Sequence, residues 1–282
     1  MTIPLFPNFK PLELSDRPAI VAYTNRYKPY SDFNFTNLWA WDTLSSRKIS
    51  ILNDNLVILF TDYRTTEPFL SFLGTNEVSE TALTLIDYAD KSGYTNTLHF
   101  IIEDTATLLR DHKLKVVEEI SNFDYIFSTH QLAESAEPKL KTKRKLATHF
   151  IKKYPEAKLT ITDFTKADIH DQILEILYCW KRNKEVTNKS CDITHEEIAL
   201  KRLFQTAHNH NVILSCLYVD NKMIGFSIDE ILDEGYAISH FIKGDINYRG
   251  VYEYMNVEVA QQLLISGAKF WNWEQDLNLE GL

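Results

Sequence analysis

The sequence predicts a mixed α/β (α+β) protein built from two halves, each with a mixed, mostly antiparallel sheet. Segments with helical periodicity alternate with short runs rich in β-branched residues, and tight polar turns at 53–55 and 220–221 join neighbouring runs. A length of 282 residues suggests about two domains. The stretch 130–138 is polar and acidic, so we place the two domains at 1–130 and 131–282.

The first half shows two helix patterns and a hairpin. Residues 15–27 begin with Ser-Asp-Arg-Pro, which is typical of a helix N-terminus with proline in the first turn. Strands are expected at 48–52 and 56–60, on either side of the turn. An amphipathic helix is expected at 79–91, and further strands at 97–102 and 124–127.

The second half shows a longer series of the same kind. Its elements, in chain order, are expected as helices at 139–154, 166–184 and 195–209, strands at 212–219, 222–231 and 236–243, a helix at 251–265 and a strand at 269–273. Antiparallel strands followed by a strand-loop-helix-strand unit are typical of acetyltransferase-like (GNAT-like) domains. We therefore expect two such domains in tandem, with the functional site in the second.

Composition excludes several classes of protein. The net charge of −9 disfavours a general nucleic-acid binder, although it leaves room for a local basic groove. Cys179, Cys191 and Cys216 are few and scattered, which favours a reducing, cytoplasmic compartment. No apolar run is long enough to span a membrane, and no histidine, cysteine and carboxylate spacing is typical of a metal site.

The strand-loop-helix at 236–265 contains the first candidate site. Backbone N–H groups at a helix N-terminus bind anions, so Arg249 and Gly250 are candidates for holding a phosphate. The alternative is an ordinary loop with turn glycines. Tyr252 would crowd a pyrophosphate, and Asn256 lies one turn further on the same face of the helix and needs a hydrogen-bond partner.

The strand before this loop supplies two candidate catalytic residues. Simple alternation places Ser239, Phe241 and Lys243 on one face and His240 on the other. Lys243 could stabilise an oxyanion, and His240 could act as a base. For a lone histidine between isoleucines, a core position is the more common alternative.

A basic helix forms a second candidate site. Residues 139–153 contain seven lysine or arginine residues and no acidic residue. Lys143 and Arg144 lie on or beside the expected apolar stripe, which suggests a phosphate or carboxylate site in a cleft that they would share with Lys243 and Arg249. The alternative is a solvated charged face with apolar stems.

Three stretches together resemble bacterial proteins similar to the C-terminal catalytic domain of phosphatidylglycerol lysyltransferase. The resemblance covers nearly the whole chain, and its clearest parts are Tyr30-Ser31-Asp32 with Phe35, Asn37 and Trp41, then Lys143-Arg144, and then Gly250-Val251-Tyr252 with Asn256 and the sequence Asn272-Trp273-Glu274-Gln275-Asp276-Leu277. It implies that Glu274 and Asp276 contribute to the substrate or carrier site. This chain departs from the family at Trp273, where a basic residue is usual.

The resemblance also implies a function. Better-known relatives move an amino acid from aminoacyl-tRNA to a lipid or peptide, so we expect an acyltransferase that acts on a small-molecule or peptide acceptor with an amine or hydroxyl group. No cofactor is expected for that reaction. The alternatives are an acyl-CoA-dependent N-acetyltransferase, which would use acyl-CoA, and a non-catalytic ligand-binding member of the fold.

Overall fold

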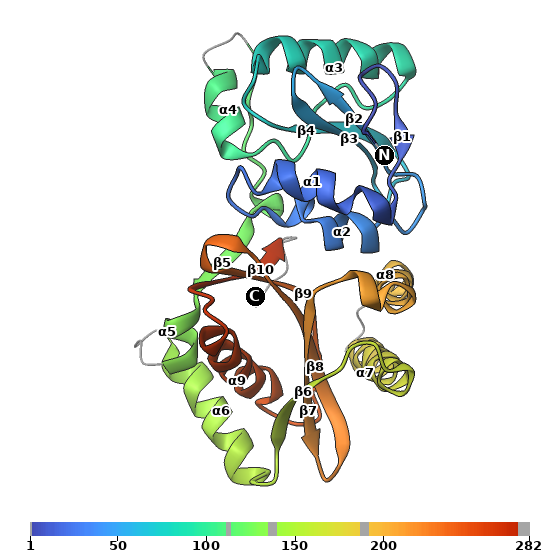
Figure 1. Cartoon of the computed structure of the whole chain (residues 1–282). Helices are drawn as coiled ribbons and strands as arrows, with labels where there is room; N and C mark the ends of the chain where they lie inside the picture. The colour runs from blue at the N-terminus through green and yellow to red at the C-terminus, as the bar shows by residue number, and fades with distance from the viewer. Residues whose placement is uncertain (1, 111–113, 135–139, 187–191, 276–282) are drawn as a thin grey trace. The chain divides into compact units, whose positions relative to one another are not determined.

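The computed structural model describes residues 2–110, 114–134, 140–186 and 192–275. They form two compact units, and the second unit begins at Asp124 (Figure 1). This point lies a few residues before the boundary expected after residue 130. The physical reason is strand β5 (Asp124–Ser128), which pairs with the last strand of the second unit, β10 (Phe270–Gln275).

The first unit has a four-stranded antiparallel sheet in the order β1-β2-β3-β4. The strands are β1 (Lys10–Pro11), β2 (Lys48–Leu52), β3 (Asn55–Thr61) and β4 (Pro68–Leu73), and the helices are α1 (Arg17–Thr24), α2 (Phe35–Ala40), α3 (Val78–Ser92) and α4 (Glu103–Arg110). One core cluster joins the sheet to α1 and α2, and a second cluster joins its other face to α3 and α4.

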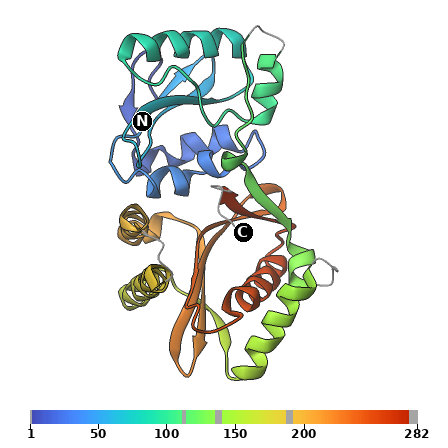
Figure 2. The ribbon, with the colours of Figure 1, turned by 180° about the vertical axis from the view of Figure 1, so that it is seen from behind.

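The second unit has a six-stranded sheet in the order β5-β10-β9-β8-β7-β6. Its remaining elements are β6 (Lys158–Thr162), β7 (Val212–Val219), β8 (Lys222–Ile231), β9 (Tyr236–Gly244), α5 (Thr129–Glu134), α6 (Lys141–Lys153), α7 (Ala167–Val186), α8 (Thr194–Gln205) and α9 (Val251–Ile265). Helices α7 and α8 lie on one face of the sheet, and α5, α6 and α9 cover the other, as Figures 1 and 2 both show.

The first unit has the order strand, two helices, three antiparallel strands and a helix, and the second unit repeats this order from β6 onward, after β5, α5 and α6. In the second unit the next strand, β10, pairs with β9 in parallel. In the first unit the corresponding segment makes a single parallel bridge, between Phe69 and Thr95. The predicted mixed α/β class is confirmed, and the repeated order fits the expected tandem arrangement.

The strand predicted at 97–102 is wrong. These residues are irregular, and Phe100 has a φ of 57°, which is incompatible with an extended strand. The prediction also omitted β4 and β6. Strand β4 has no β-branched residue and begins at a proline, so its pattern is weak, although five of its six residues are buried.

Candidate functional site

The candidate site lies where β9 and β10 separate. The two strands pair in parallel over Tyr236 to Ile238 on β9 and Phe270 to Asn272 on β10. Beyond that point β9 continues against β8, whereas β10 continues against β5. Polar side chains from both strands gather at this divergence, in a unit whose strands are otherwise mostly apolar.

Strand β9 contains a bulge at His240. Ser239 pairs with Asp229, and Phe241 pairs with Ile228, so three residues of β9 lie opposite two residues of β8, with His240 as the extra residue. Adjacent β8 residues point to opposite faces of the sheet, so Ser239 and Phe241 do too. The predicted shared face of Ser239 and Phe241 is therefore wrong, because one inserted residue reverses the alternation.

His240 is buried between two carboxylates. Its Nε2 atom lies 3.2 Å from Oε2 of Glu230, and its Nδ1 atom lies 3.4 Å from Oε1 of Glu274. Burial by itself lowers the pKa of His240, but hydrogen bonds to Glu230 and Glu274 outweigh burial and raise the pKa to about 9. The imidazole is therefore protonated at neutral pH. A ring whose two nitrogens both donate to carboxylates cannot accept a proton, which disfavours a role as base.

Glu274 lies in a second irregularity, on β10. The register of β10 against β5 shifts between Asn272 and Gln275, and Glu274 has a φ of 63°, in the left-handed region. The buried Asn272 stabilises this conformation, because its Oδ1 atom accepts a hydrogen bond of 2.7 Å from the Glu274 backbone N–H. The Nδ2 atom of Asn272 donates to Asp124 at 2.7 Å. The backbone conformation at Glu274 thus helps to direct its side chain toward His240.

Lys243 lies near the end of β9, on the same face of the sheet as Phe241. The Nζ atom is 2.8 Å from Oε1 of Glu196 on α8 and 4.4 Å from the ring centroid of Trp180 on α7. The hydroxyl of Tyr252 accepts a hydrogen bond of 3.1 Å from the Gly244 backbone N–H, and burial raises the pKa of Tyr252. A cation and a buried phenol therefore lie close to the same strand end.

Asn256 follows Tyr252 by one turn of α9. Among the residues that the structure describes, none donates a hydrogen bond to its buried Oδ1 atom. A buried acceptor of this kind is uncommon in a folded protein and indicates a place where a ligand or water would bind. The described residues thus contain no partner for Asn256 Oδ1, although the sequence predicted that this side chain needs one.

The loop between β9 and α9 is fixed by Asp245. Its Oδ1 atom accepts hydrogen bonds from the backbone N–H of Asn247 at 3.0 Å, the Asn247 side chain at 2.7 Å and Asn183 of α7 at 3.2 Å. This network ties the loop to α7, and Arg249 is exposed near its end.

Gly250 has a structural role that differs from the phosphate binding expected from the sequence. It is the N-cap residue of α9 with a φ of 91°, and a Cβ atom at this position would overlap the carbonyl oxygen of Leu146 on α6. The missing side chain therefore lets α6 pack directly against the start of α9. The space in which we expected a phosphate to approach the backbone is taken by protein atoms.

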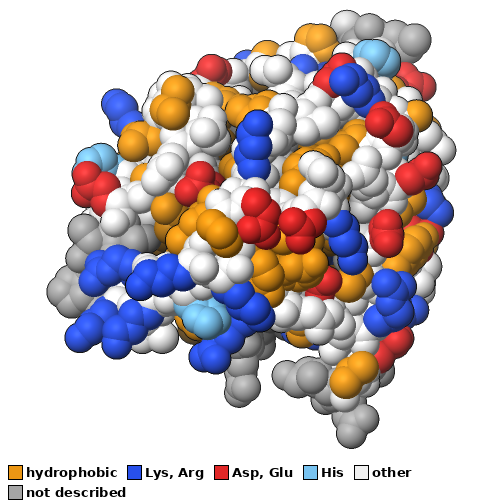
Figure 3. Space-filling model, turned by 90° about the horizontal axis from the view of Figure 1, so that it is seen from below, with side chains coloured by type: hydrophobic (Ala, Val, Ile, Leu, Met, Phe, Trp, Pro, Cys, Tyr) orange, Lys and Arg blue, Asp and Glu red, His pale blue; other side chains and the backbone are white. Residues whose placement is uncertain are grey.

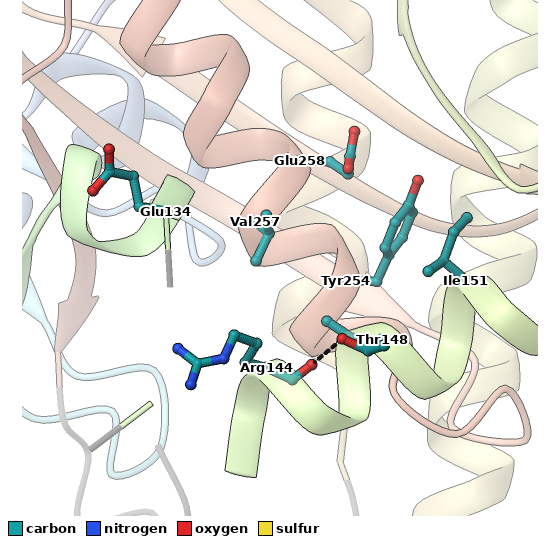
Figure 4. Close-up of a pocket in the computed structure, with 8 residues that line it drawn as sticks. Glu134, Arg144, Thr148, Ile151, Tyr254, Val257 and Glu258 are labelled. Atoms are coloured by element: carbon teal, nitrogen blue, oxygen red, sulfur yellow. Dashed lines mark hydrogen bonds between the residues drawn. The ribbon is translucent and has the colours of Figure 1, made fainter. Parts of the chain in front are cut away.

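The basic helix α6 lies on the α9 face of the sheet. Lys143 and Arg144 are both exposed, and Arg144 borders a groove of about 200 Å³ between α5, α6 and α9 (Figure 4). The groove is lined by Glu134, Arg144, Ala147, Thr148, Ile151, Tyr254, Val257 and Glu258. Lys243 contacts α7 and α8 on the opposite face, so these basic residues do not share one cleft. Asp276, the last predicted site residue, lies outside the described residues.

Sequence reasoning missed several members of the site. Glu230, Glu196 and Trp180 fix candidate residues in place, yet none of them belongs to a recognisable motif. Asn272 belongs to the stretch at 272–277 that carries the family resemblance, but the sequence assigned it no role. One signal in the sequence could have indicated part of this cluster. Asp229 and Glu230 are adjacent acids inside an otherwise apolar strand, and both are buried. Buried carboxylates need partners, which is typical of a functional or structural polar cluster.

The described residues contain neither a metal site nor a membrane span. No group of three histidine, cysteine, aspartate or glutamate side chains in this part of the chain is arranged to hold a metal ion. None of the described helices is both long enough and apolar enough to cross a bilayer.

Comparisons with known proteins identify a family. The model of the family described as "Phosphatidylglycerol lysyltransferase, C-terminal" matches residues 24–282. A conserved protein of unknown function from Bacteroides thetaiotaomicron VPI-5482 is 22% identical with a TM-score of 0.81, and the match covers 97% of this chain and 92% of that one. No curated protein matches this chain.

Two further solved structures share the fold at lower identity. L-PGS from Bacillus licheniformis is 12% identical with a TM-score of 0.63, over 100% of this chain and 81% of that one. FemX is 10% identical with a TM-score of 0.55, over 95% of this chain and 88% of that one. At these identities the likeness establishes the fold and leaves the activity to be argued from the site.

Proposed function

We propose that this chain, which belongs to the phosphatidylglycerol lysyltransferase C-terminal family, is an acyltransferase that moves an aminoacyl group from aminoacyl-tRNA to an amine or hydroxyl acceptor. The family description names a lysyl transfer, which is a reaction of this class. The acceptor we expect is a small molecule or a peptide.

The observation that carries the choice of donor is the closed N-terminus of α9. An acyl-CoA pyrophosphate would be held by backbone N–H groups at such a helix start. Here Gly250 lies against Leu146, and the ring of Tyr248 packs on Tyr154 with centroids 5.1 Å apart. A pyrophosphate would have to displace α6, so acyl-CoA is the less favoured donor.

The surface of α6 supports a polyanionic donor. Six of its thirteen residues are lysine or arginine, none is acidic, and the cations are exposed: Lys141, Lys143, Arg144, Lys145, Lys152 and Lys153. Lysine and arginine side chains gather on the face of the molecule seen from below (Figure 3). In a chain of net charge −9, such a helix would provide a local surface for the phosphates of tRNA.

The chemistry would take place near the end of β9. The acceptor attacks the ester carbonyl carbon, a new C–N or C–O bond forms, and the ester C–O bond to the ribose breaks with the proton passing to the ribose oxygen. The Lys243 ammonium, held by Glu196 and Trp180, would stabilise the oxyanion. Positioning of two bound substrates supplies much of the rate, so a strong base is unnecessary.

The test is transfer from charged tRNA. The purified chain is incubated with tRNA pools charged with radiolabelled amino acids and with mixtures of amine and hydroxyl acceptors, and loss of the tRNA ester is followed. We expect deacylation above the spontaneous rate, and its loss in Lys243→Met. If no pool is deacylated and no product forms, the proposal is wrong.

Thermal denaturation with CoA tests the alternative donor. A ligand present at 100 times its dissociation constant stabilises a protein by about 2.7 kcal/mol. We expect CoA to leave the melting temperature unchanged, whereas a clear rise would favour an acyl-CoA-dependent reaction instead.

A further inference from the structure

The hydroxyl of Tyr252 lies at the part of β9 that β10 leaves unpaired. Its oxygen accepts a hydrogen bond of 3.1 Å from the Gly244 backbone N–H. The next N–H along the strand, that of Asp245, donates to the Ile224 carbonyl on β8 at 2.8 Å, so the Gly244 N–H points to the opposite edge of β9. Strand β10 pairs with that edge only as far as Ile238. The phenol therefore lies at an open edge of the strand, and its side chain is partly exposed.

The Tyr252 hydroxyl has a proton that it can donate. A phenol is both a hydrogen-bond donor and an acceptor, and the Gly244 N–H uses its acceptor side. The Trp180 side chain also bonds to this hydroxyl, and its indole N–H can only donate. Of the hydrogen bonds that the described residues make with the Tyr252 hydroxyl, none uses its proton. That proton is therefore available to a ligand.

The surroundings of the phenol suit it to give up a proton and to regain it. Burial raises the pKa of Tyr252, so the hydroxyl is protonated at neutral pH. The Lys243 ammonium, the Gly244 N–H and the Trp180 side chain all favour the phenolate and partly offset burial. Glu196 acts against the phenolate, but it is paired with Lys243 at 2.8 Å. An acid that is neutral at rest, with donors placed around its conjugate base, has the chemistry of a general acid.

Aminoacyl transfer from tRNA has a step that such an acid would accelerate. When the ester C–O bond breaks, the ribose oxygen departs as an alkoxide unless it gains a proton at the same time. An alkoxide is a poor leaving group, and a positioned general acid contributes about 10²–10⁴-fold to such a step. The Lys243 ammonium, which lies 4.4 Å from the centroid of the Trp180 ring, is assigned to the carbonyl oxygen. The leaving oxygen therefore needs a second group.

We propose that Tyr252 is a catalytic residue that donates its hydroxyl proton to the ribose oxygen as the ester C–O bond breaks. The attacking nitrogen or oxygen of the acceptor carries an extra proton once it has bonded to the carbonyl carbon, and it returns that proton to the phenolate. The protons balance, and the phenol is regenerated. Trp180 is a positioning residue for the phenolate. This inference rests on the proposed function and adds to it the group that protonates the leaving oxygen.

The experiment compares two donors whose leaving groups differ in their need for a proton. The first donor is tRNA charged with mixed radiolabelled amino acids, and the second is a mixture of the 4-nitrophenyl esters of the same amino acids. Both are given to the full chain with the same mixture of amine and hydroxyl acceptors, and rates are corrected for the reaction without protein. Because 4-nitrophenolate leaves without protonation, we expect Tyr252→Phe to slow transfer from tRNA about 100-fold and to change transfer from the nitrophenyl esters by less than about threefold.

Two further variants serve as controls for the donor comparison. Lys243→Met should slow transfer from both donors, because an oxyanion forms with either. Tyr218→Phe removes a phenol hydroxyl from β7, where burial also raises the pKa of the tyrosine, and should change neither rate.

Trp180→Phe keeps the proposal testable if Tyr252→Phe does not fold, which a melting curve shows. This variant retains an aromatic ring beside Lys243 and removes the indole N–H that bonds to the phenol. We expect transfer from tRNA to slow at least about threefold and transfer from the nitrophenyl esters to stay unchanged. Equal losses with the two donors would overturn the positioning role of Trp180.

The outcomes separate this inference from the proposed function. If Tyr252→Phe loses the same factor with both donors, or loses nothing with charged tRNA, Tyr252 is not the acid and the proposed function still stands. If the wild-type chain transfers from neither donor, the proposed function is wrong and the role of Tyr252 falls with it.

Discussion

Gly250 lies directly against the backbone of Leu146, so that the first turn of α9 and the middle of α6 touch without an intervening side chain. The contact brings the backbone of α6 against the start of α9. The contact also predicts that a side chain at position 250 would destabilise the protein.

Gly250→Ala should lower the free energy of unfolding by about 2–4 kcal/mol. The added methyl group meets a backbone oxygen that cannot move without shifting α6, and the φ of 91° adds strain. Gly267→Ala is a matched control, because Gly267 also has a φ of 91° but has nothing within 4 Å of the added Cβ atom. Urea denaturation measures both. Equal losses in the two variants would mean that the contact with Leu146 is unimportant.

The stability of the fold should depend on the protonation of His240. The pKa of His240 is raised from 6.5 to about 9, although burial alone would lower it, because Glu230 and Glu274 stabilise the imidazolium. This contribution is complete below pH 6.5 and is lost as the pH rises through about 9, by up to roughly 3 kcal/mol. Denaturation curves between pH 6 and pH 9.5 check this. His240→Gln should flatten the profile, and an equally steep loss in that variant would point to other groups.

The ionised Asp229 carboxylate should destabilise the folded protein at neutral pH. Burial raises its pKa to about 6, despite hydrogen bonds from Ser227 at 2.6 Å and from the Trp271 indole at 3.0 Å. Because this pKa lies above its ordinary value of 3.8, stability falls as the pH rises from about 4 to about 6. Asp229→Asn can keep both hydrogen bonds without the charge.

We therefore expect Asp229→Asn to raise the melting temperature at pH 7.5 and to remove the loss between pH 4 and pH 6. Asp171→Asn, at an exposed position, should do neither. A lower melting temperature in Asp229→Asn at pH 7.5 would show that the buried charge is satisfied by its partners.

Helix α6 should contribute phosphate contacts to tRNA binding. Lys143→Ala and Arg144→Ala should each weaken binding and reduce the slope of log affinity against log salt by about one. Lys48→Ala, an exposed position in the first unit, should leave the slope unchanged. Filter binding over a series of salt concentrations measures the slope. If all three variants match the wild type, the α6 surface is a solvated face.

Local signals in the sequence were sufficient to predict much of the secondary structure of the second unit. The turn at Asp220 and Asn221 and the apolar runs around it predicted the β7–β8 hairpin, and Gly250 marked the start of α9 as its N-cap residue. Each of these features is decided by residues close together in the chain. The family resemblance was likewise carried by short stretches and is confirmed over residues 24–282.

The site depended on relationships that no local signal contains. Lys243 was singled out, but its partner Glu196 lies 47 positions earlier on another helix. Glu274 was included through the family pattern, yet its contact with His240 and its left-handed backbone depend on the pairing of β9 and β10. The expected single cleft failed because α6 packs on α9 and away from Lys243.

The extra residue in β9 has a consequence for anyone who compares this chain with a distant relative. From His240 onward, every side chain of the strand has changed sides relative to a strand without the insertion, although the letters of the two sequences can still be written in matching columns. Where the relative's strand has no such bulge, a role assigned by counting from Tyr236 would fall on the wrong side of the sheet, and superposed backbones give the right correspondence.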